Sequence, residues 1–493
     1  MPRPHLPFAR RASLVAACAL LPGCAVGPDF ERPAAPPVAA YTSPTDSAAP
    51  ASGAQPRLTD ADIPAQWWRL FRSDALDALV RQALDASPTL EQASARLRQA
   101  SEDLNAETGG RLQPAVDANL SATRQKVDPS AYGVPVAEQP APFTLYNASI
   151  DVSYTLDVFG GNRRALEGLA AQVDYQSHEL QAARMTLAAN VVTTAIRQAD
   201  LAARLADTRE LLAAQQRQRD IMAQRLRAGG IAEADLRNQE LLLAQTEASV
   251  PPLQYQLAQA QHRLATYLGQ PPSAWQAPPL RLADLTLPAE IPTGVPSALT
   301  RQRPDILAAE ALLHQASAQV GVATANQYPR FTLTASFGAQ RTRAGDIADG
   351  VNVWNLGLGL VQPLLHGGEL RARTRSAQAA YEAAAAAYRQ TVLDGLRQVA
   401  DALRALQTDA QAYDAYDTAW RRADDAARIA RDRYQAGGIS HLDLLDSQRQ
   451  LLQTRIARGA ADAARYADTA ALLQALGGGW WNTSAPSPAG AAP

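Results

Sequence analysis

The residue types that most often perform chemistry are sparse in this 493-residue chain, and they form no catalytic pattern. No two of its six histidines stand at the spacing of a metal-ligand pair. These histidines are His5, His178, His262, His314, His366 and His441. The sequence also lacks a G-x-S-x-G elbow, a phosphate-binding loop and an H-E-x-x-H motif. We therefore expect no catalytic residue, no metal site and no cofactor.

The remaining chemical signals are equally weak. His441 and Asp443 form the one suggestive pair, but two residues that stand two apart on a helix do not face each other. Cys18 and Cys24 both lie near the N-terminus, so the body of the chain has neither a disulfide framework nor a catalytic thiol. Lysine and arginine total 46 against 48 for aspartate and glutamate, which gives no excess positive charge for binding nucleic acid. Composition thus argues against an enzyme and against a nucleic-acid-binding protein.

The N-terminus has the features of a bacterial export signal. Three arginines within the first eleven residues precede the apolar run 12–21, which is too short to span a bilayer. The run ends in Leu-Pro-Gly-Cys24, which resembles a lipobox and predicts a signal peptide over 1–23 and a lipid on Cys24. An ordinary secretory signal is the alternative. Ala25 follows the cysteine, and lipoproteins with aspartate there tend to stay in the inner membrane, so we expect the outer membrane.

The body of the chain repeats itself. Arg225-Leu-Arg-Ala-Gly-Gly-Ile231 returns as Arg433-Tyr-Gln-Ala-Gly-Gly-Ile439, at an offset of 208 residues. The same offset carries Asp235-Leu236 onto Asp443-Leu444. Matches at several points and one offset predict two copies of one structural unit.

These matches divide the mature chain into regions. Seven prolines between 271 and 297 exclude a continuous helix there, so this segment is interpreted as a linker. The expected regions are a lipid-anchored tether over 24–75, repeat 1 over 76–270, the linker over 271–297, repeat 2 over 298–480 and a disordered tail over 481–493.

Each repeat contains one very long expected helix. Proline is absent from 162–228 and 368–436, and at about 1.5 Å per residue either helix would be roughly 100 Å long. Both ranges carry apolar stripes at alternating spacings of four and three, which are typical of coiled-coil packing. The stripes are Leu201, Leu205, Thr208 and Leu212, and Val392, Leu396, Val399, Leu403, Leu406, Ala410 and Tyr413. Both helices end at Ala-Gly-Gly, where glycine favours a left-handed cap.

A shorter helix is expected to return from each Ala-Gly-Gly turn. The expected ranges are 231–268 and 439–476. Pro251 and Pro252 lie inside the first return helix, and Gly459 lies at the equivalent place in the second. Because proline lacks the N–H that continues a helix, we expect a bend or break at both places.

Four segments alternate apolar and polar residues with the period of a β-strand. They are 114–124 and 147–158 in repeat 1, and 329–340 and 353–363 in repeat 2. Each is long enough to cross a bilayer as a tilted strand, with the polar loops 125–146 and 341–350 then facing outside. A half-buried sheet of a soluble protein would show the same alternation. Four strands cannot close a barrel alone, so a membrane sheet would need several subunits.

Four motifs, taken together and in this order, resemble the TolC-like outer-membrane factors. They are Cys24-Ala-Val-Gly-Pro-Asp-Phe-Glu-Arg-Pro33, Trp67-Trp-Arg-Leu-Phe71, Arg303-Pro-Asp-Ile306 with Glu310, and Ala475-Leu-Gly-Gly-Gly-Trp480. The similarity covers essentially the whole mature chain and is greatest for the NodT-type lipoproteins of RND tripartite efflux systems. It implies a mostly α-helical homotrimer with membrane β-structure. Four strands per chain would form a 12-stranded β-barrel, continuous with a long α-helical coiled-coil barrel.

The resemblance also implies roles for residues near the two turns. The residues that ring a closed periplasmic aperture would be Leu442, Asp443 and Asp446, and the pair that locks it would be Tyr434 and Asp235. Ile439 stands where relatives often have an arginine in that lock. The turn residues that would contact a periplasmic adaptor are Arg225, Arg227, Gly229, Gly230, Arg433, Gly437 and Gly438. On the residues alone, the better explanation is that Asp443 and Asp446 are ordinary surface charges near a helix N-terminus.

The implied function is that of an outer-membrane exit duct, which passively conducts drugs or other small molecules out of the cell. The implied partners are a periplasmic adaptor, an inner-membrane RND-type transporter and outer-membrane lipid, with no nucleic acid. A channel for type I secretion or heavy-metal export is the alternative within the resemblance. A periplasmic adaptor lipoprotein would need one hairpin and a β-rich half, whereas this chain has two hairpins in a duplicated unit.

Overall fold

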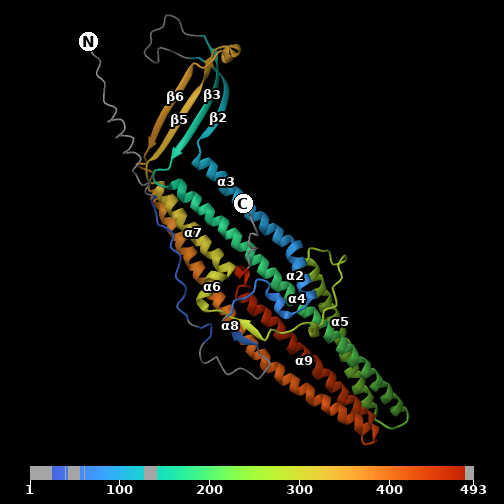
Figure 1. The fold of residues 1–493 in the computed structure, drawn as a ribbon. Helices are drawn as coiled ribbons and strands as arrows, with labels where there is room; N and C mark the ends of the chain where they lie inside the picture. Colours follow the sequence, from blue (N-terminus) through green and yellow to red (C-terminus); the bar gives the residue numbers. More distant parts are fainter. Residues whose placement is uncertain (1–24, 39, 43–55, 60, 127–140, 483–493) are drawn as a thin grey trace, which may run out of the picture. The chain divides into compact units, whose positions relative to one another are not determined.

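The computed structural model describes residues 25–38, 40–42, 56–59, 61–126 and 141–482. The expected signal peptide, Cys24 and residues 483–493 of the expected tail lie outside the described residues. Contacts divide the chain into two compact units, and each is described by itself (Figure 1). The sheet unit comprises Met1–Pro33, Arg96–Gln176 and Ala309–Tyr388, and the helical unit comprises Ala34–Ala95, Ser177–Ala308 and Arg389–Pro493.

The sheet unit contains a four-stranded antiparallel sheet in the order β2-β3-β5-β6 (Figure 1). Its strands are β2 (Ala115–Gln125), β3 (Phe143–Leu156), β5 (Arg330–Arg341) and β6 (Val353–Val361). β3 begins four residues before the expected start at 147, so 143–146 is strand rather than loop. The apolar residues change from odd-numbered to even-numbered positions near Tyr146, which hides the start of the strand from the sequence pattern. Phe143 to Tyr146 nevertheless pair with the end of β2. The second expected loop, 341–350, contains the short 3₁₀ helix η5 (Ala344–Ala348).

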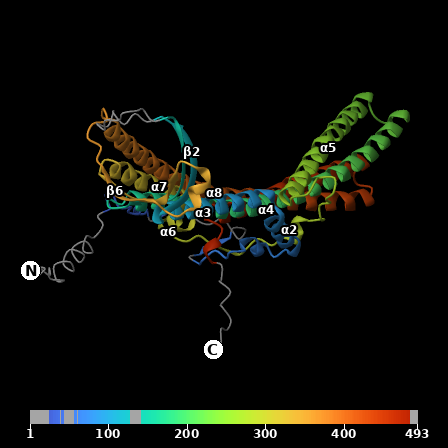
Figure 2. The ribbon, with the colours of Figure 1, turned by 90° about the horizontal axis from the view of Figure 1, so that it is seen from above.

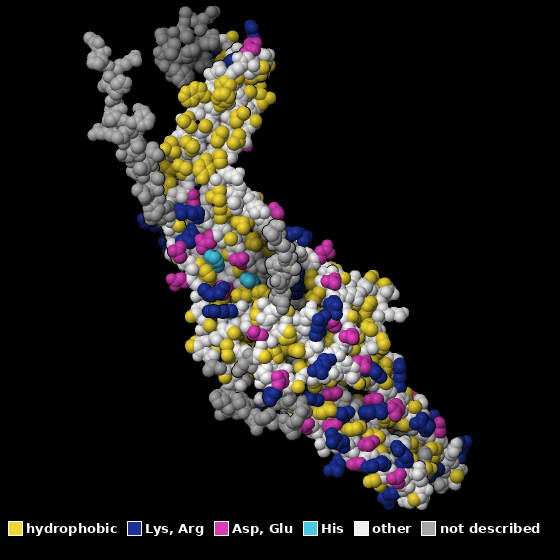
Figure 3. Space-filling model, in the orientation of Figure 1, with side chains coloured by type: hydrophobic (Ala, Val, Ile, Leu, Met, Phe, Trp, Pro, Cys, Tyr) yellow, Lys and Arg dark blue, Asp and Glu magenta, His cyan; other side chains and the backbone are white. Residues whose placement is uncertain are grey.

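One face of this sheet carries the apolar side chains. Across the four strands, Ala118, Ile150, Phe337 and Trp354 stand in one row. Trp354 is 77% exposed, and the leucines that follow it on the same face of β6 are more than half exposed. Figure 3 shows hydrophobic side chains gathered over the strands. A sheet of a soluble protein would bury this face, so the exposed apolar surface contradicts the half-buried alternative.

Two pairs of long helices form the two repeats. α4 (Gly161–Arg227) and α8 (Glu369–Gln435) have 67 residues each, and α5 (Glu233–Tyr267) and α9 (His441–Ala475) have 35 each. α8 and α9 begin 208 residues after α4 and α5, which is the offset seen in the sequence. In the helical unit, α5 returns along the last part of α4 (Figure 2). Within the described residues, no helix combines the length and hydropathy needed to span a membrane.

The helices continue where a bend or break was expected. α5 includes Pro251 and Pro252, and α9 includes Gly459, each in one unbroken helical assignment. A break is therefore contradicted at both places, whereas the bend stays a prediction. Both prolines are exposed, so water can bond to the carbonyls that lose their intrahelical partners. Glycine costs a helix interior only about 1 kcal/mol relative to alanine, which packing can offset.

Apolar stripes on the long helices are buried as coiled-coil packing requires. Val399 is fully buried, and Val392, Leu406 and Ala410 on the same stripe are at most 4% exposed. On α4, the stripe continues through Leu211 rather than the expected Leu212. Leu212 is half-buried beside it.

Shorter elements complete the fold. They are β1 (Arg57–Thr59), η2 (Trp67–Phe71), α2 (Asp74–Ala86), α3 (Pro88–Leu112), η4 (Leu282–Asp284), β4 (Glu290–Pro292), α6 (Pro296–Gln302), α7 (Pro304–Ala325) and η6 (Trp480–Asn482). β1 pairs in parallel with β4, so the expected tether and the expected linker form a small sheet together. Trp481 and Asn482 belong to η6 and are ordered, because the Asn482 amide donates to the Ile63 carbonyl at 2.8 Å. The expected disordered tail therefore starts too early, at 481.

Candidate functional site at the helical turns

Each long helix ends in a turn that only glycine suits. Gly229 and Gly437 have φ of +73° and +74°, in the left-handed region. The amide of Gly230 donates to the Arg225 carbonyl at 2.8 Å, and the amide of Gly438 donates to the Arg433 carbonyl at 2.7 Å. These bonds close the last turn of α4 and α8 in the same way. The repeated Ala-Gly-Gly motif is therefore a helix stop, and it leaves both turns exposed.

The basic residues expected at the turns lie in the last helical turns. Arg225 and Arg227 lie in the last turn of α4, and Arg433 lies in the last turn of α8. The Arg227 Nε donates to the Ala223 carbonyl at 3.3 Å. Cations near a helix C-terminus are favoured by the helix dipole, so these arginines have a local structural role as well.

Asp443 caps the start of α9. Its Oδ2 accepts hydrogen bonds from the Ser440 amide at 3.0 Å and the Ser440 hydroxyl at 2.8 Å. The Ser440 Oγ in turn accepts from the Asp443 amide at 3.2 Å, which completes a capping box. The bond from the Ser440 hydroxyl, then that from its amide, and the charge of Arg433 hold the pKa of Asp443 below its ordinary value. Asp443 is therefore an ionised, exposed carboxylate at neutral pH.

Asp446 lies on the same face of α9 as Asp443, three residues further on. Its Oδ1 accepts from the Arg449 Nε at 3.1 Å, while more than half of its side chain stays exposed. Leu444 and Leu445 between the two aspartates are buried, and Leu442 is half-buried. The first two turns of α9 thus present two carboxylates outward and pack Leu444 and Leu445 inward.

The two residues of the expected lock lie at different helix ends. Asp235 is in the first turn of α5, where its Oδ2 accepts from the Ala232 amide at 3.3 Å. It is the repeat-1 counterpart of Asp443, but alanine replaces the serine, so the hydroxyl half of the capping box is missing. Tyr434 is in the last turn of α8 and is 39% exposed. Both side chains are accessible for contacts beyond their own helices.

Sequence reasoning missed the link between the two hairpins of the chain. The Arg455 guanidinium on α9 lies 2.7 Å from the Asp207 carboxylate on α4 and also pairs with Glu210. No local pattern identifies such a pair, because its members stand about 245 residues apart. The capping box of Ser440 with Asp443, by contrast, is a readable sequence signal.

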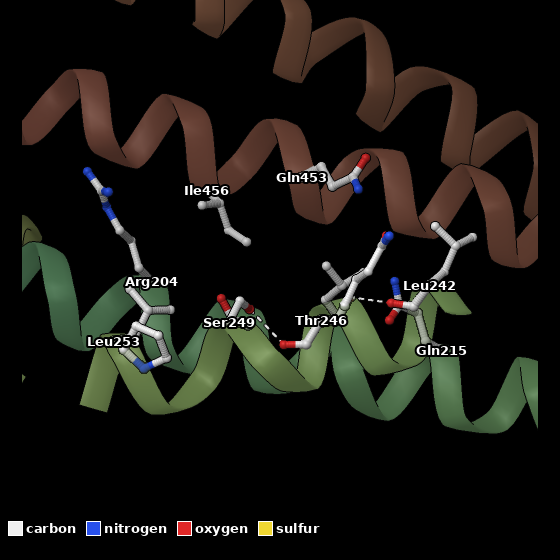
Figure 4. Close-up of a pocket in the computed structure, with 12 residues that line it drawn as sticks. Arg204, Gln215, Leu242, Thr246, Ser249, Leu253, Gln453 and Ile456 are labelled. Carbon is white, nitrogen blue, oxygen red and sulfur yellow. Dashed lines mark hydrogen bonds between the residues drawn. The ribbon is translucent and has the colours of Figure 1, made fainter. Parts of the chain in front are cut away.

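A cavity of about 610 Å³ lies beside this link, between α4, α5 and α9 (Figure 4). α9 contributes Gln453 and Ile456, and α4 and α5 contribute the other lining residues. The Thr246 hydroxyl donates to the Leu242 carbonyl at 3.1 Å, and the Ser249 hydroxyl donates to the Thr246 carbonyl at 2.7 Å. The seam between the hairpins is therefore incompletely packed, although Arg455 bridges it.

Two further motif residues have structural roles. Arg303 is 3% exposed and donates to the Ala475 carbonyl at 2.7 Å, to Asp305 and to Gln398, so it closes the C-terminal end of α9. In the sheet unit, Glu310 accepts from the Arg32 Nε at 2.6 Å. No group of three or more metal-ligating side chains gathers anywhere in the described residues.

The chain matches one family model, in two segments. The model described as outer membrane efflux protein matches residues 79–270 and 295–478. The chain is 33% identical over 444 residues to the pyoverdine export outer membrane protein OpmQ of Pseudomonas putida, covering 89% of this chain and 94% of that protein. It is 31% identical over 480 residues to the toluene efflux pump outer membrane protein TtgC of Pseudomonas putida, covering 95% of each.

Solved structures give the same result. The outer-membrane channel OprN is similar with a TM-score of 0.81 and 31% identity, over 93% of this chain and all of that chain. The MtrE outer membrane channel of Neisseria gonorrhoeae, in its open state, is similar with a TM-score of 0.79 and 25% identity, over 93% of this chain and 99% of that chain.

Proposed function

The chain belongs to the outer membrane efflux protein family, and from this we propose that it forms the exit duct of a tripartite efflux pump. It is an outer-membrane efflux channel that extends into the periplasm. Proteins of this family transport solutes rather than convert them, and they work with a periplasmic adaptor and an inner-membrane transporter. For this chain, the finer assignments below are proposals.

We propose that three chains share one 12-stranded barrel. The sheet has four strands, and within the described chain its edge strands β2 and β6 have no further strand beside them. An open edge is not tolerated in lipid, because each unpaired backbone group there costs several kcal/mol. Pairing of β6 of one subunit with β2 of the next satisfies both edges and turns the exposed apolar face toward lipid. Cys24 would carry the lipid anchor.

We propose that Leu442, Asp443 and Asp446 line the periplasmic aperture. The support is the geometry of α9, which presents both carboxylates outward at the turn. Three subunits would bring six carboxylates to one constriction, where they attract cations and repel one another. A closed aperture then needs contacts between hairpins, and we assign this lock to Tyr434 and Asp235, with Arg455 and Asp207 adding a link within each chain.

The exposed turns are the proposed contact surface for the adaptor. They comprise Arg225, Arg227, Gly229, Gly230, Arg433, Gly437 and Gly438. The identical helix stop in both repeats would offer six similar turns per trimer, which suits an adaptor that binds in multiple copies. An inner-membrane RND-type transporter would then supply the energy, since the duct itself holds no cofactor in this proposal.

One observation carries the proposal: a sheet with an exposed apolar face and two open edges, joined to two helical hairpins. The test is the native mass of the protein extracted from outer membranes in mild detergent. We expect a particle of three acylated chains that conducts ions in a planar bilayer. A monomer released without detergent would contradict the shared barrel.

A further inference from the structure

A hollow lies on the apolar face of the sheet, beneath the loop that joins β5 to β6. Its floor is formed by two rows of residues across β2, β3 and β5. The rows are Ala118, Ile150 and Phe337, and Leu120, Ala148 and Ala339. η5 and Val351 form the wall. The hollow has a volume of about 450 Å³, which is within the size range of small-molecule sites.

The loop covers one side of this hollow and leaves the other open. Ala339 is 6% exposed, whereas Phe337, two residues earlier on the same face of the same strand, is 57% exposed. The space exists because small residues stand between large ones: Ala148 and Ala339 on the floor, and Ala348 and Gly350 in the wall. Leu120 and Ile150 remain at least half exposed on the open side.

The loop is held in place by polar contacts outside the hollow. The Asn352 side chain donates to the Gln340 carbonyl at 2.9 Å and accepts from the Gln340 amide at 2.8 Å. The Arg341 guanidinium donates to the Gly350 carbonyl at 3.2 Å. Gly350 has a φ of +93°, which a larger residue would adopt only with strain. These contacts fix the wall, so the hollow is preformed.

We propose that this hollow binds an acyl chain of an outer-membrane lipid. A water molecule would be bound weakly in the hollow, because a buried water needs two to four polar partners and the residues around the hollow are mainly apolar. An acyl chain needs no such partners and gains apolar contact along Leu120, Ile150 and Ile347. The proposal rests on the proposed function, which places this face of the sheet in lipid.

The test uses the trimer in vesicles of phosphatidylethanolamine that contain a phosphatidylethanolamine with a diazirine in its acyl chain. After illumination, labelled residues are mapped by mass spectrometry. We expect a several-fold excess of labelling at 148–150 and 347–351 over Leu356 and Leu358, which lie on the same apolar face outside the hollow. Even labelling of the whole face would overturn the proposal, because it would mean ordinary boundary lipid only.

Two variants and a matched control make the test specific. Ala148→Phe fills the hollow from the floor, and Ala348→Trp fills it from the loop without altering the sheet. Either should remove the excess while labelling of Leu356 persists. Ala335→Phe adds the same bulk to the same face outside the hollow and should keep the excess.

Two further results would count against the site. If residues 347–351 were not labelled by the lipid and were cross-linked to another chain, a neighbouring subunit would fill the hollow. This result would overturn the proposal. Absence of label at Leu356 and Leu358 in the unmodified protein would instead contradict the membrane placement itself. It would overturn the proposed function and this proposal with it, so the two failures are distinguishable.

Discussion

At the scale of single residues, the same carboxylate has different properties at different places in this chain. Asp443 is exposed and receives two hydrogen bonds from Ser440, so its charged form is favoured. Asp409 on α8 lies against Asp468 on α9, and its buried Oδ2 has no donor beside it. Two carboxyl groups in contact cannot both be ionised without repulsion, so this pair is expected to share a proton.

The cap and the charge of Asp443 can be separated by two substitutions. Ser440→Ala removes the hydroxyl that bonds to Asp443, and we expect a loss of about 1 kcal/mol of helix stability. The pKa of Asp443 should rise toward its ordinary value, yet the carboxylate stays ionised at pH 7. Asp443→Asn removes the charge. Reversal potentials in asymmetric salt should show reduced cation preference in Asp443→Asn only. An equal change in Ser440→Ala would mean that helix capping, not charge, sets the preference.

The proton shared by Asp409 predicts a pH dependence. Burial, then the hydrogen bond and charge of Asp468, raise the pKa of Asp409 to about 7, against an opposing contribution from Arg465. The folded chain then retains a proton that the unfolded chain releases near pH 3.8. Stability should therefore fall as pH rises from about 4 to about 7. The melting temperature, measured across this pH range, should decline less in Asp409→Asn than in the unmodified chain. The exposed Asp424→Asn is the matched control, and an unchanged slope in Asp409→Asn would refute the shared proton.

At the scale of helices and strands, local patterns predicted most of the fold. The absence of proline, the Ala-Gly-Gly stops and the 208-residue offset gave four helices with ends within two residues of those observed. The predicted elements were wrong where a local sequence rule is overridden by the solvent or the neighbouring strand around the residue. Exposed Pro251 and Pro252 are tolerated within α5 because water can replace the lost hydrogen bonds. The start of β3 was misplaced because pairing with β2 extends it through Phe143 and Leu145, against the alternation.

The candidate site was less accessible from sequence than the fold. Residues 442–446 could be placed on the first two turns of α9, and the capping box of Ser440 could be recognised from the sequence. The partner of Asp446 and the bridge from Arg455 to α4 depend on tertiary packing, which a local pattern does not contain. The roles of these residues in an aperture stay predictions that follow from family membership.

Loss of the Arg455 bridge should loosen the two hairpins within one chain. Arg455→Ala leaves Asp207 and Glu210 without their shared cation, and a partly exposed pair contributes about 1 kcal/mol or less. We expect faster amide hydrogen exchange in α4 around 207 and in α9 around 455, with helix content unchanged. Arg237→Ala removes pairs within α5 alone and should leave exchange at both places unaltered. Unaltered exchange in Arg455→Ala would show that packing, not this bridge, joins the hairpins.

At the scale of the whole molecule, the chain is incomplete by itself. Its sheet exposes an apolar face, which is costly in water, and, in the described residues, two unpaired edges, which are costly in lipid. The apolar stripes of its long helices, by contrast, are already buried within the chain. The proposed assembly in a membrane would cover the apolar face with lipid and pair the edges, while leaving the helical hairpins as they are in one chain.

We expect the two faces of strand β6 to tolerate a positive charge differently. Leu356 and Asn355 are neighbours near the middle of β6, and Leu356, on the apolar face, is 69% exposed. An arginine on the lipid face near the bilayer midplane costs about 2–4 kcal/mol. Leu356→Arg should therefore reduce the yield of outer-membrane trimer and shift urea unfolding in vesicles to lower concentration. Asn355→Arg, which adds the same charge to the polar face, should keep the trimer and alter ion conductance instead. Equal damage by both substitutions would mean that neither face of β6 meets lipid, because only a bilayer distinguishes them in this way.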